Sequence, residues 1–183
     1  EQAKISGYRT VGVYMGLLGV GYNPEVLKAR KLTPPKCWSD LTKPEFAGEI
    51  QISNPNSSGT AYTAMATFVQ LYGGENEGFA YMKSLGNNVS QYTKSGSAPA
   101  KALARGETGI GITFLHDLLK ETMAGMPVEV LAPCEGTGFE IGSMSIIKGA
   151  RNMENAKKFY EFALRPDVQS LAIKANALQI PSN

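Results

Sequence analysis

The chain has 183 residues, 43% of them hydrophobic, which is enough to bury a core. Its 18 basic and 16 acidic residues leave a formal net charge of +2, and no stretch combines clustered Lys and Arg with aromatic residues. We therefore expect no nucleic-acid surface, and any anion should be bound by a local site. No apolar run approaches the roughly 20 residues that span a bilayer. The segment Glu1–Lys4 lacks a signal-peptide pattern, but a cleaved signal would leave no trace, so the compartment stays open.

The two cysteines, Cys37 and Cys134, stand far apart in the sequence, without a CxxC pattern and without a histidine nearby. A zinc site is therefore not expected at these cysteines. The sequence also contains no cluster of metal-binding residues elsewhere and no cofactor-binding loop. The cysteines are either two buried thiols or one long-range disulfide. On the chain-entropy account, a disulfide closing so long a loop would add about 4 kcal/mol of stability.

The first part of the chain, Gly7 to Tyr22, is apolar and rich in glycine. We interpret it as an extended segment that crosses between two packed bodies, with glycines where backbones approach closely. A dinucleotide-binding loop is the alternative, but the glycine spacing is wrong and no helix opens directly from the run. A helix should follow from Pro24, and Trp38 and Phe46 are expected in the core rather than in a ligand site.

A first polar turn follows the predicted strand Glu49–Ser53 and precedes a helix with apolar residues at helical spacing, Ala61–Tyr72. The start of a helix presents unpaired N–H groups and a partial positive charge, so it can bind a phosphate or a carboxylate. The candidate ligand-binding residues in this turn are Ser57, Ser58, Gly59 and Thr60. The alternative is that Ser57 or Ser58 is an ordinary helix cap, and the two interpretations are compatible.

A second turn of the same type follows a helix at Glu75–Leu85 and a short strand at Val89–Tyr92. Ser97 is expected to cap a helix that has Pro99 in its first turn. The candidate residues here are Ser95, Gly96 and Ser97. Two hydroxyl-rich turns, each after a strand, suggest that two anion-binding corners face one cleft.

A third strand, Thr108–Phe114, brings the single histidine of the sequence, His116, and its neighbour Asp117 to its carboxyl end. In open α/β sheets ligands bind at that edge, so we expect both side chains to face a cleft and to hydrogen-bond a polyhydroxylated ligand. The alternative is that His116 only caps a helix starting at Asp117.

The remaining chain continues the alternation of strands and helices and predicts an α/β fold around a mainly parallel sheet. Strands are expected at Val128–Leu131 and at Phe139–Ile147, which contains Glu140, and helices at Met153–Leu164 and Asp167–Ala175. We divide the chain into a crossing strand with a remnant of the first lobe (residues 1–23), an α/β second lobe (residues 24–132) and a return crossing with a portion of the first lobe (residues 133–183).

Five stretches, in this order and spacing, resemble the type II periplasmic solute-binding proteins of ABC importers, in the ferric-iron-binding-like branch. The stretches are GVGYN (Gly19–Asn23), WSDL (Trp38–Leu41), PNSSGTAY (Pro55–Tyr62), QYTKSGSAP (Gln91–Pro99) and EGTGFEIG (Glu135–Gly142). The resemblance covers almost the whole chain, from Tyr8 to Asn183.

The resemblance implies a type II periplasmic binding protein lobe with hinge-crossing strands and part of the other lobe, and a ligand in an interlobe cleft. It further implies a periplasmic location and an ABC permease in the membrane as partner. Such proteins have a first part, and a stretch after the position of Asn183, that this sequence lacks. The other half of the cleft is therefore expected from a complementing chain or a domain swap, if it is supplied at all.

The resemblance also bears on the ligand. Iron-binding members carry adjacent tyrosines after the strand that here ends at Phe114, whereas this sequence has His116 and Asp117, so iron is disfavoured. Members that bind hexose phosphates have a His-Asp pair here and a later glutamate matching Glu140, all three addressing sugar hydroxyls. The phosphate would lie on the serine-rich helix starts.

The resemblance thus implies a transport receptor for a small anionic solute, a hexose phosphate, with ferric iron or a phosphonate as the alternative ligand. An enzyme that uses His116, Asp117 and Glu140 for acid–base chemistry is a second class of function. The sequence contains no nucleophile-plus-base motif, so we expect no catalytic residues.

Overall fold

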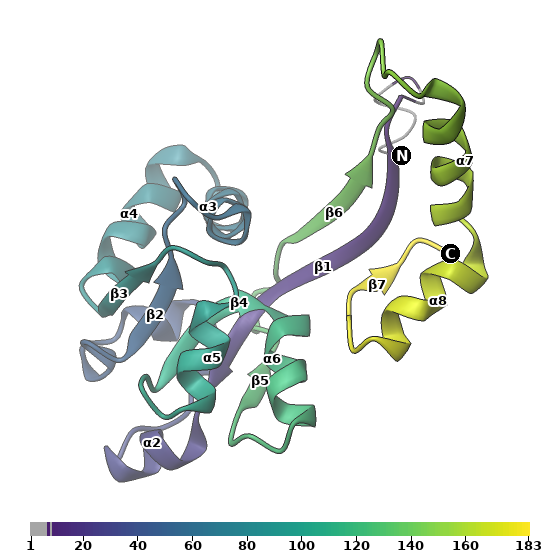
Figure 1. Cartoon of the computed structure of the whole chain (residues 1–183). Coiled ribbons are helices and arrows are strands. Elements are labelled where there is room, and N and C mark those ends of the chain that lie inside the picture. Colours follow the sequence, from purple (N-terminus) through teal and green to yellow (C-terminus); the bar gives the residue numbers. More distant parts are fainter. Residues whose placement is uncertain (1–6, 8) are drawn as a thin grey trace. The chain divides into compact units, whose positions relative to one another are not determined.

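The computed structural model describes residue 7 and residues 9–183, in which strands and helices alternate (Figure 1). The strands are β1 (Val11–Tyr22), β2 (Ile50–Ser53), β3 (Val89–Thr93), β4 (Ile110–Phe114), β5 (Glu129–Leu131), β6 (Phe139–Met144) and β7 (Ile180–Pro181). The helices are α2 (Pro24–Ala29), α3 (Gly59–Leu71), α4 (Glu75–Gly86), α5 (Ala98–Ala104), α6 (Leu115–Met123), α7 (Met153–Ala163) and α8 (Pro166–Lys174), with 3-10 turns η1 (Ser39–Thr42) and η2 (Pro44–Phe46). The α/β class is confirmed, whereas the predictions for Glu1–Lys4 lie outside the described residues.

The chain forms two compact units, which we call the central and the terminal unit. The central unit runs from Leu17 to Phe139, and the terminal unit comprises the chain up to Gly16 and from Glu140 to Asn183. None of the helices in the described part of the chain combines the length and the apolarity that crossing a membrane requires.

The sheet of the central unit has the strand order β3-β2-β4-β1-β5. Strand β2 lies parallel to both β3 and β4, with Ile52 paired to Tyr92 on one side and to Ile112 on the other. Strand β1 lies antiparallel to β4 and to β5. Four of the five strands therefore point the same way, and the predicted mainly parallel sheet is confirmed.

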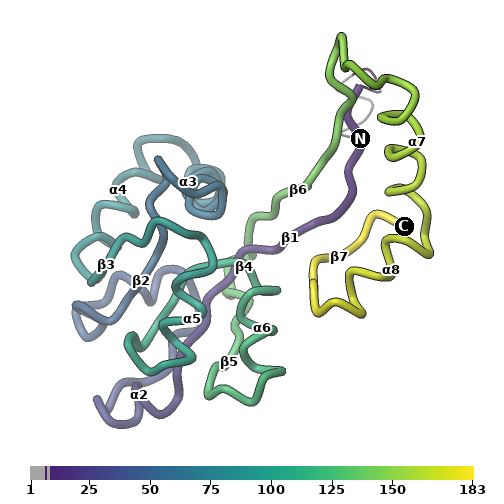
Figure 2. Tube along the Cα trace, in the orientation of Figure 1, coloured from purple at the N-terminus to yellow at the C-terminus, as the bar shows by residue number. Residues whose placement is uncertain are grey.

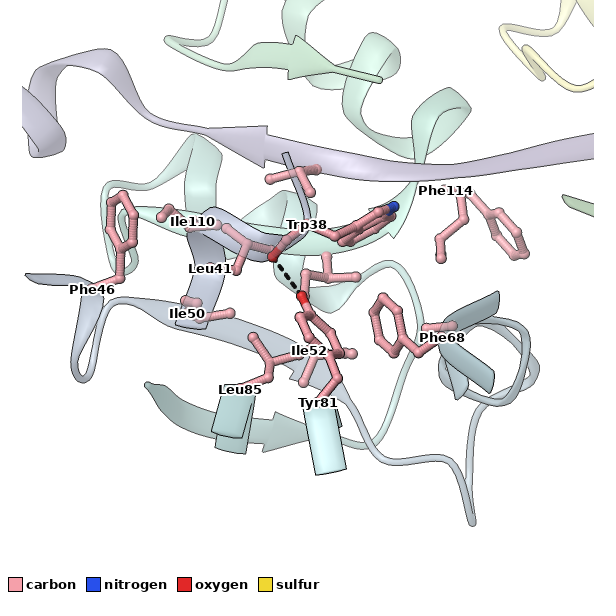
Figure 3. Close-up of a cluster of buried hydrophobic side chains, with 14 of the residues drawn as sticks. Trp38, Leu41, Phe46, Ile50, Ile52, Phe68, Tyr81, Leu85, Ile110 and Phe114 are labelled. Carbon is pink, nitrogen blue, oxygen red and sulfur yellow. Dashed lines mark hydrogen bonds between the residues drawn. The ribbon is translucent and has the colours of Figure 1, made fainter. Parts of the chain in front are cut away.

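One face of this sheet is covered by the larger core (Figure 3). Trp38 is fully buried and packs edge-on against Phe68 of α3, with ring centroids 5.1 Å apart. Tyr81 of α4 lies 4.8 Å from Phe68 and donates its O–H to the carbonyl oxygen of Trp38 at 2.6 Å. Trp38 and Phe46 thus occupy the core, as predicted, and each fully buried aromatic side chain stabilises the unit by about 2 kcal/mol or more.

The opposite face of the sheet is lined by glycines, and α5 and α6 pack directly on it. A Cβ atom at Gly19 would overlap the side chain of Leu115, and one at Gly21 would overlap that of Leu118. At Gly111 of β4 a Cβ atom would lie 2.9 Å from Leu103. Successive residues of a strand point to opposite faces, so the glycines fall on one face while their neighbours fill the larger core. The predicted close approach at the glycines is confirmed.

The chain passes into and out of the central unit at one place. Leu18 donates its N–H to the carbonyl oxygen of Gly138 at 3.0 Å and accepts a hydrogen bond from the hydroxyl of Thr137 at 2.9 Å. A few residues before Thr137, Cys134 forms a disulfide with Cys37. The sequence left open whether the two cysteines are free thiols or a disulfide, and the structure shows the disulfide. The bond closes a loop across 97 positions of the sequence.

In the terminal unit β6 and β7 pair with β1, and α7 and α8 follow one another along the chain (Figure 2). Strand β7 pairs antiparallel with Tyr14 and Met15 of β1. The buried Gln169 of α8 donates to the hydroxyl of Ser182 at 3.0 Å and so ties the helix to the end of the chain. The elements of this unit are therefore held together by strand pairing and polar contacts, and most of their side chains are half-buried or exposed.

Candidate functional site

The carboxyl ends of three parallel strands lie at one edge of the central sheet. Strand β2 ends at Ser53, β3 at Thr93 and β4 at Phe114, and each leads into a turn that the sequence singled out. Because parallel strands place their carboxyl ends together, this edge is where a ligand is expected. The candidate residues of the central unit all follow these three strand ends.

The first serine turn is held by hydroxyl groups rather than by helix capping. Ser58 occupies the N-cap position of α3, but its side chain makes no capping hydrogen bond. Its hydroxyl instead accepts from the hydroxyl of Ser53 at 3.0 Å. Ser57 donates to the carbonyl oxygens of Asn54 and Lys94, at 3.3 and 3.1 Å. The ordinary-cap interpretation is therefore wrong for both serines, and α3 begins without a side-chain cap.

The second serine turn packs directly against the first. A Cβ atom at Gly96 would overlap the hydroxyl of Thr60 and lie 3.0 Å from that of Ser58, so only glycine allows this approach. The hydroxyl groups of Ser95 and Ser97 hydrogen-bond each other at 3.3 Å. The predicted cap is wrong, because the Ser97 side chain makes no capping hydrogen bond to α5. The structure thus brings the two turns together at one edge of the sheet.

His116 lies inside the first turn of α6, because the helix begins at Leu115 rather than at Asp117. The imidazole stacks on the ring of Phe114, with centroids 5.2 Å apart and planes 15° from parallel. Its side chain is 13% exposed, and burial lowers its pKa below the ordinary value although Asp117 acts in the opposite direction. His116 is therefore not a helix cap, and its neutral ring has both a donor and an acceptor nitrogen.

Asp117 connects α6 to the second turn. The carboxylate oxygen Oδ2 of Asp117 accepts from the hydroxyl of Thr113 at 3.3 Å, and Thr113 also donates to the carbonyl oxygen of Gly96 at 2.7 Å. The other carboxylate oxygen lies 4.0 Å from Nε2 of His116. A quarter of the Asp117 side chain is exposed. The carboxylate is thus positioned from within the protein and is still accessible to an incoming hydroxyl group.

Glu140, the remaining candidate, belongs to the terminal unit and lies on β6, half-buried. Burial raises the pKa of Tyr14 on β1, and the negative charge of Glu140 raises it further. Glu140 therefore lies near β1 in its own unit, and a role in ligand binding stays a prediction.

Sequence reasoning missed the buried hydroxyl groups behind the two turns. Ser53, Thr93 and Thr113 are the last or penultimate residues of their strands, and each is less than a tenth exposed. The available signal was a Ser or Thr at or next to the end of each of the three strands. A buried hydroxyl needs a hydrogen-bond partner, and the turn that follows the strand is the nearest one.

One group of potential metal ligands exists among the described residues, formed by Cys37, Cys134 and Glu135. Both sulfur atoms belong to the disulfide, so neither is a thiolate. The carboxylate of Glu135 accepts from the backbone N–H groups of Trp38 and Ser39, at 2.7 and 2.9 Å. This group is therefore a structural clamp.

The family described as bacterial extracellular solute-binding protein matches residues 1–183. The chain belongs to this family. The resemblance stated from the sequence is thereby confirmed, and the strand-end site lies in a member of a ligand-binding family rather than in an unrelated α/β protein.

Solved structures support the family membership. The periplasmic binding protein AfuA from Actinobacillus pleuropneumoniae, described with exogenous fructose-6-phosphate bound, is 54% identical with a TM-score of 0.92. The match covers 97% of this chain and 56% of that chain. The periplasmic binding protein P5PA is 43% identical with a TM-score of 0.92, over 100% of this chain and 58% of that one.

Among the curated relatives, an uncharacterized protein of Haemophilus influenzae is 53% identical over 185 residues, which is 100% of this chain and 53% of the relative. The chain spans about half the length of the curated relatives it matches.

Proposed function

We propose that the protein is the substrate-binding component of an ABC transporter and that it binds a hexose phosphate. The observation that carries the proposal is the meeting of two serine turns and the Asp117 carboxylate at one sheet edge. A relative that is 54% identical is described with fructose-6-phosphate bound, which supports the same ligand class here. We further propose a periplasmic location and a membrane permease as partner.

The two serine turns are proposed to bind the phosphate. The N–H and the hydroxyl of Ser57 already donate within the protein, so the donors proposed for the phosphate in the first turn are the hydroxyl of Ser58, which accepts from Ser53, and the backbone N–H groups at the start of α3. Helix α3 has 13 residues, so its amino terminus adds a partial positive charge. Helix α5 has only 7 residues, so we assign its turn a role through hydroxyl groups alone. The residues concerned are Ser57, Ser58, Gly59, Thr60, Ser95, Gly96 and Ser97.

The sugar is proposed to lie on His116, Asp117 and Glu140. An ionised carboxylate only accepts hydrogen bonds, and a neutral imidazole donates one and accepts one, so the three groups suit neighbouring hydroxyls. A hydrogen bond between a hydroxyl and a charged group is stronger than one between neutral partners. The chemistry of these side chains, together with that of the serine turns, therefore favours a ligand with an anionic end and a hydroxylated end.

The domain assignment also stays a proposal. We assign residues 24–132 to one lobe of the receptor, and residues 1–23 and 133–183 to the crossing strands and a portion of the other lobe. The central unit, Leu17–Phe139, contains the whole of the first range.

The test is isothermal titration calorimetry of the chain with fructose 6-phosphate, fructose, inorganic phosphate, ferric iron and a phosphonate. We expect fructose 6-phosphate to bind much more tightly than fructose or phosphate alone. Tighter binding of iron or of the phosphonate would contradict the proposed ligand. Phosphorus NMR of the recovered sugar phosphate should show it unchanged, and a new phosphorus signal would favour an enzyme instead.

A further inference from the structure

A layer of three buried hydroxyl groups supports the two serine turns from beneath. Ser53 is 0% exposed, Thr93 is 8% and Thr113 is 0%, and each lies at the end of a different parallel strand. Ser53 donates to the hydroxyl of Ser58, and Thr93 donates to the carbonyl oxygen of Ser95, both at 3.0 Å. These two each hold one turn, whereas Thr113 contacts both a turn and Asp117.

Thr113 has one hydroxyl proton and two acceptors for it. Its Oγ1 lies 2.7 Å from the carbonyl oxygen of Gly96 and 3.3 Å from Oδ2 of Asp117. A hydroxyl group donates only one hydrogen bond at a time, and the shorter contact takes the larger share. The carboxylate of Asp117 is therefore incompletely satisfied from within the protein, and Gly96 competes with it.

The position of Thr113 follows from the packing of β4. Gly111, two residues earlier, faces Leu103 and Pro99 of α5, so Thr113 points to the same side of the sheet at its end. There it lies beneath the starts of α5 and α6, where Gly96 and Asp117 are found. One side chain thus reaches both groups without a change of rotamer.

We propose that Thr113 is a positioning residue that couples the turn of residues 95–97 to the carboxylate of Asp117. The proposal rests on the proposed function. A ligand hydroxyl that donates to Asp117 satisfies the carboxylate and releases the Thr113 proton wholly to Gly96, which fastens the turn. Thr113 therefore favours ligands that carry hydroxyl groups together with the anion over inorganic phosphate alone.

The test compares Thr113→Val and Thr113→Ser with a matched control, Thr108→Val. Thr108 precedes the opposite end of β4, is 2% exposed, and also has two acceptors, the carbonyl oxygens of Glu49 and Ile110 at 2.8 and 3.2 Å. Both valine variants lose a buried hydroxyl, but only one of them loses it at the site. Thr113→Ser keeps the hydroxyl and shows whether a valine effect comes from altered packing.

Two measurements are made on each variant. In the ligand-free protein, amide hydrogen exchange at Ala98, whose N–H donates to the carbonyl oxygen of Ser95, reports the mobility of the turn. We expect Thr113→Val alone to accelerate this exchange. By calorimetry we expect it to weaken fructose 6-phosphate binding about tenfold, the effect of losing a hydrogen bond near a charged group, with a much smaller change for inorganic phosphate.

Equal exchange at Ala98 in Thr113→Val and Thr108→Val would overturn the proposal, as would equal losses of affinity for the two ligands in Thr113→Val. If the unsubstituted protein binds no fructose 6-phosphate, the proposed function fails, and the exchange comparison still decides whether Thr113 positions the turn. If Thr113→Ser behaves like Thr113→Val, the hydroxyl is not the cause and the proposal fails.

Discussion

The indole N–H of Trp38 donates a hydrogen bond of 3.0 Å to the carbonyl oxygen of Gly136. Next to it the carboxylate of Glu135 accepts from two backbone N–H groups, and the disulfide between Cys37 and Cys134 closes the same contact. Burial alone would raise the pKa of Glu135, but the N–H groups of Ser39 and Trp38 hold it below its ordinary value. The loop after β5 is therefore fixed to the segment that leads into η1.

Removal of the disulfide should destabilise the chain strongly. The double variant Cys37→Ser with Cys134→Ser should lose about 4 kcal/mol of unfolding free energy, because the bond closes a long loop in the unfolded chain. Urea unfolding followed by circular dichroism measures this loss. Thiol titration of the unfolded, unreduced protein should find no free thiol, and two free thiols would refute the pairing.

The stability of the chain should depend on the protonation of its single histidine. Burial lowers the pKa of His116 below 6.5, with Asp117 opposing, so the unfolded chain binds more protons in the window below 6.5. The stability that the neutral imidazole provides is fully present above pH 6.5. It is lost as the pH falls from 6.5 toward the lowered pKa of His116 in the folded protein. Urea unfolding between about pH 5 and pH 7 should show this loss, and His116→Gln should remove it. An identical slope in the variant would contradict the shift.

Substitution of the carboxylates should weaken ligand binding without unfolding the protein. Asp117→Ala and Glu140→Ala should each reduce the affinity for fructose 6-phosphate about tenfold or more, because in the proposed site each carboxylate accepts a charge-assisted hydrogen bond from the sugar. Glu107→Ala is the control, since Glu107 is exposed and bonded to Arg105. Unchanged binding in both test variants would remove these residues from the site.

A side chain at the glycine face of the sheet should disrupt the packing of α6. Gly21→Ala should cost about 1–3 kcal/mol, because the added methyl group overlaps Leu118 and lies 2.8 Å from Leu103. The double variant Gly21→Ala with Leu118→Ala should lose less unfolding free energy than the sum of the losses in the two single variants. The smaller side chain at position 118 leaves room for the methyl group at position 21. Strict additivity in a double-mutant cycle would argue against this contact.

The strands and helices of the central unit could be predicted because their patterns are local. The apolar spacing of Ala61–Tyr72 and the Asn23-Pro24 helix start both correspond to helices in the structure, and Asn23 caps α2 through its side chain. The predicted cap at Ser97 is wrong, and so is the alternative that Ser57 or Ser58 caps α3 through its side chain. Their hydroxyl groups bond to residues that only the tertiary fold brings near.

The state of the cysteines and the role of Thr113 needed the fold for the same reason. Cys37 and Cys134 are joined across 97 positions, and sequence spacing alone does not say which distant thiols meet. In the sequence alone, Thr113 cannot be distinguished from any other β-branched residue of a buried strand. Its importance appears only when the starts of α5 and α6 are placed above the end of β4.

The contact of Leu18 with Thr137 and Gly138 has a consequence for protein engineering. The ends of the central unit lie side by side, as in domains that tolerate insertion into another host protein. A short linker joining residue 139 to residue 17 would give a circular permutant, with new termini opened in an exposed turn such as the one at Gly125. We therefore expect residues 17–139 to be transferable into a host protein as one piece that carries both serine turns with it.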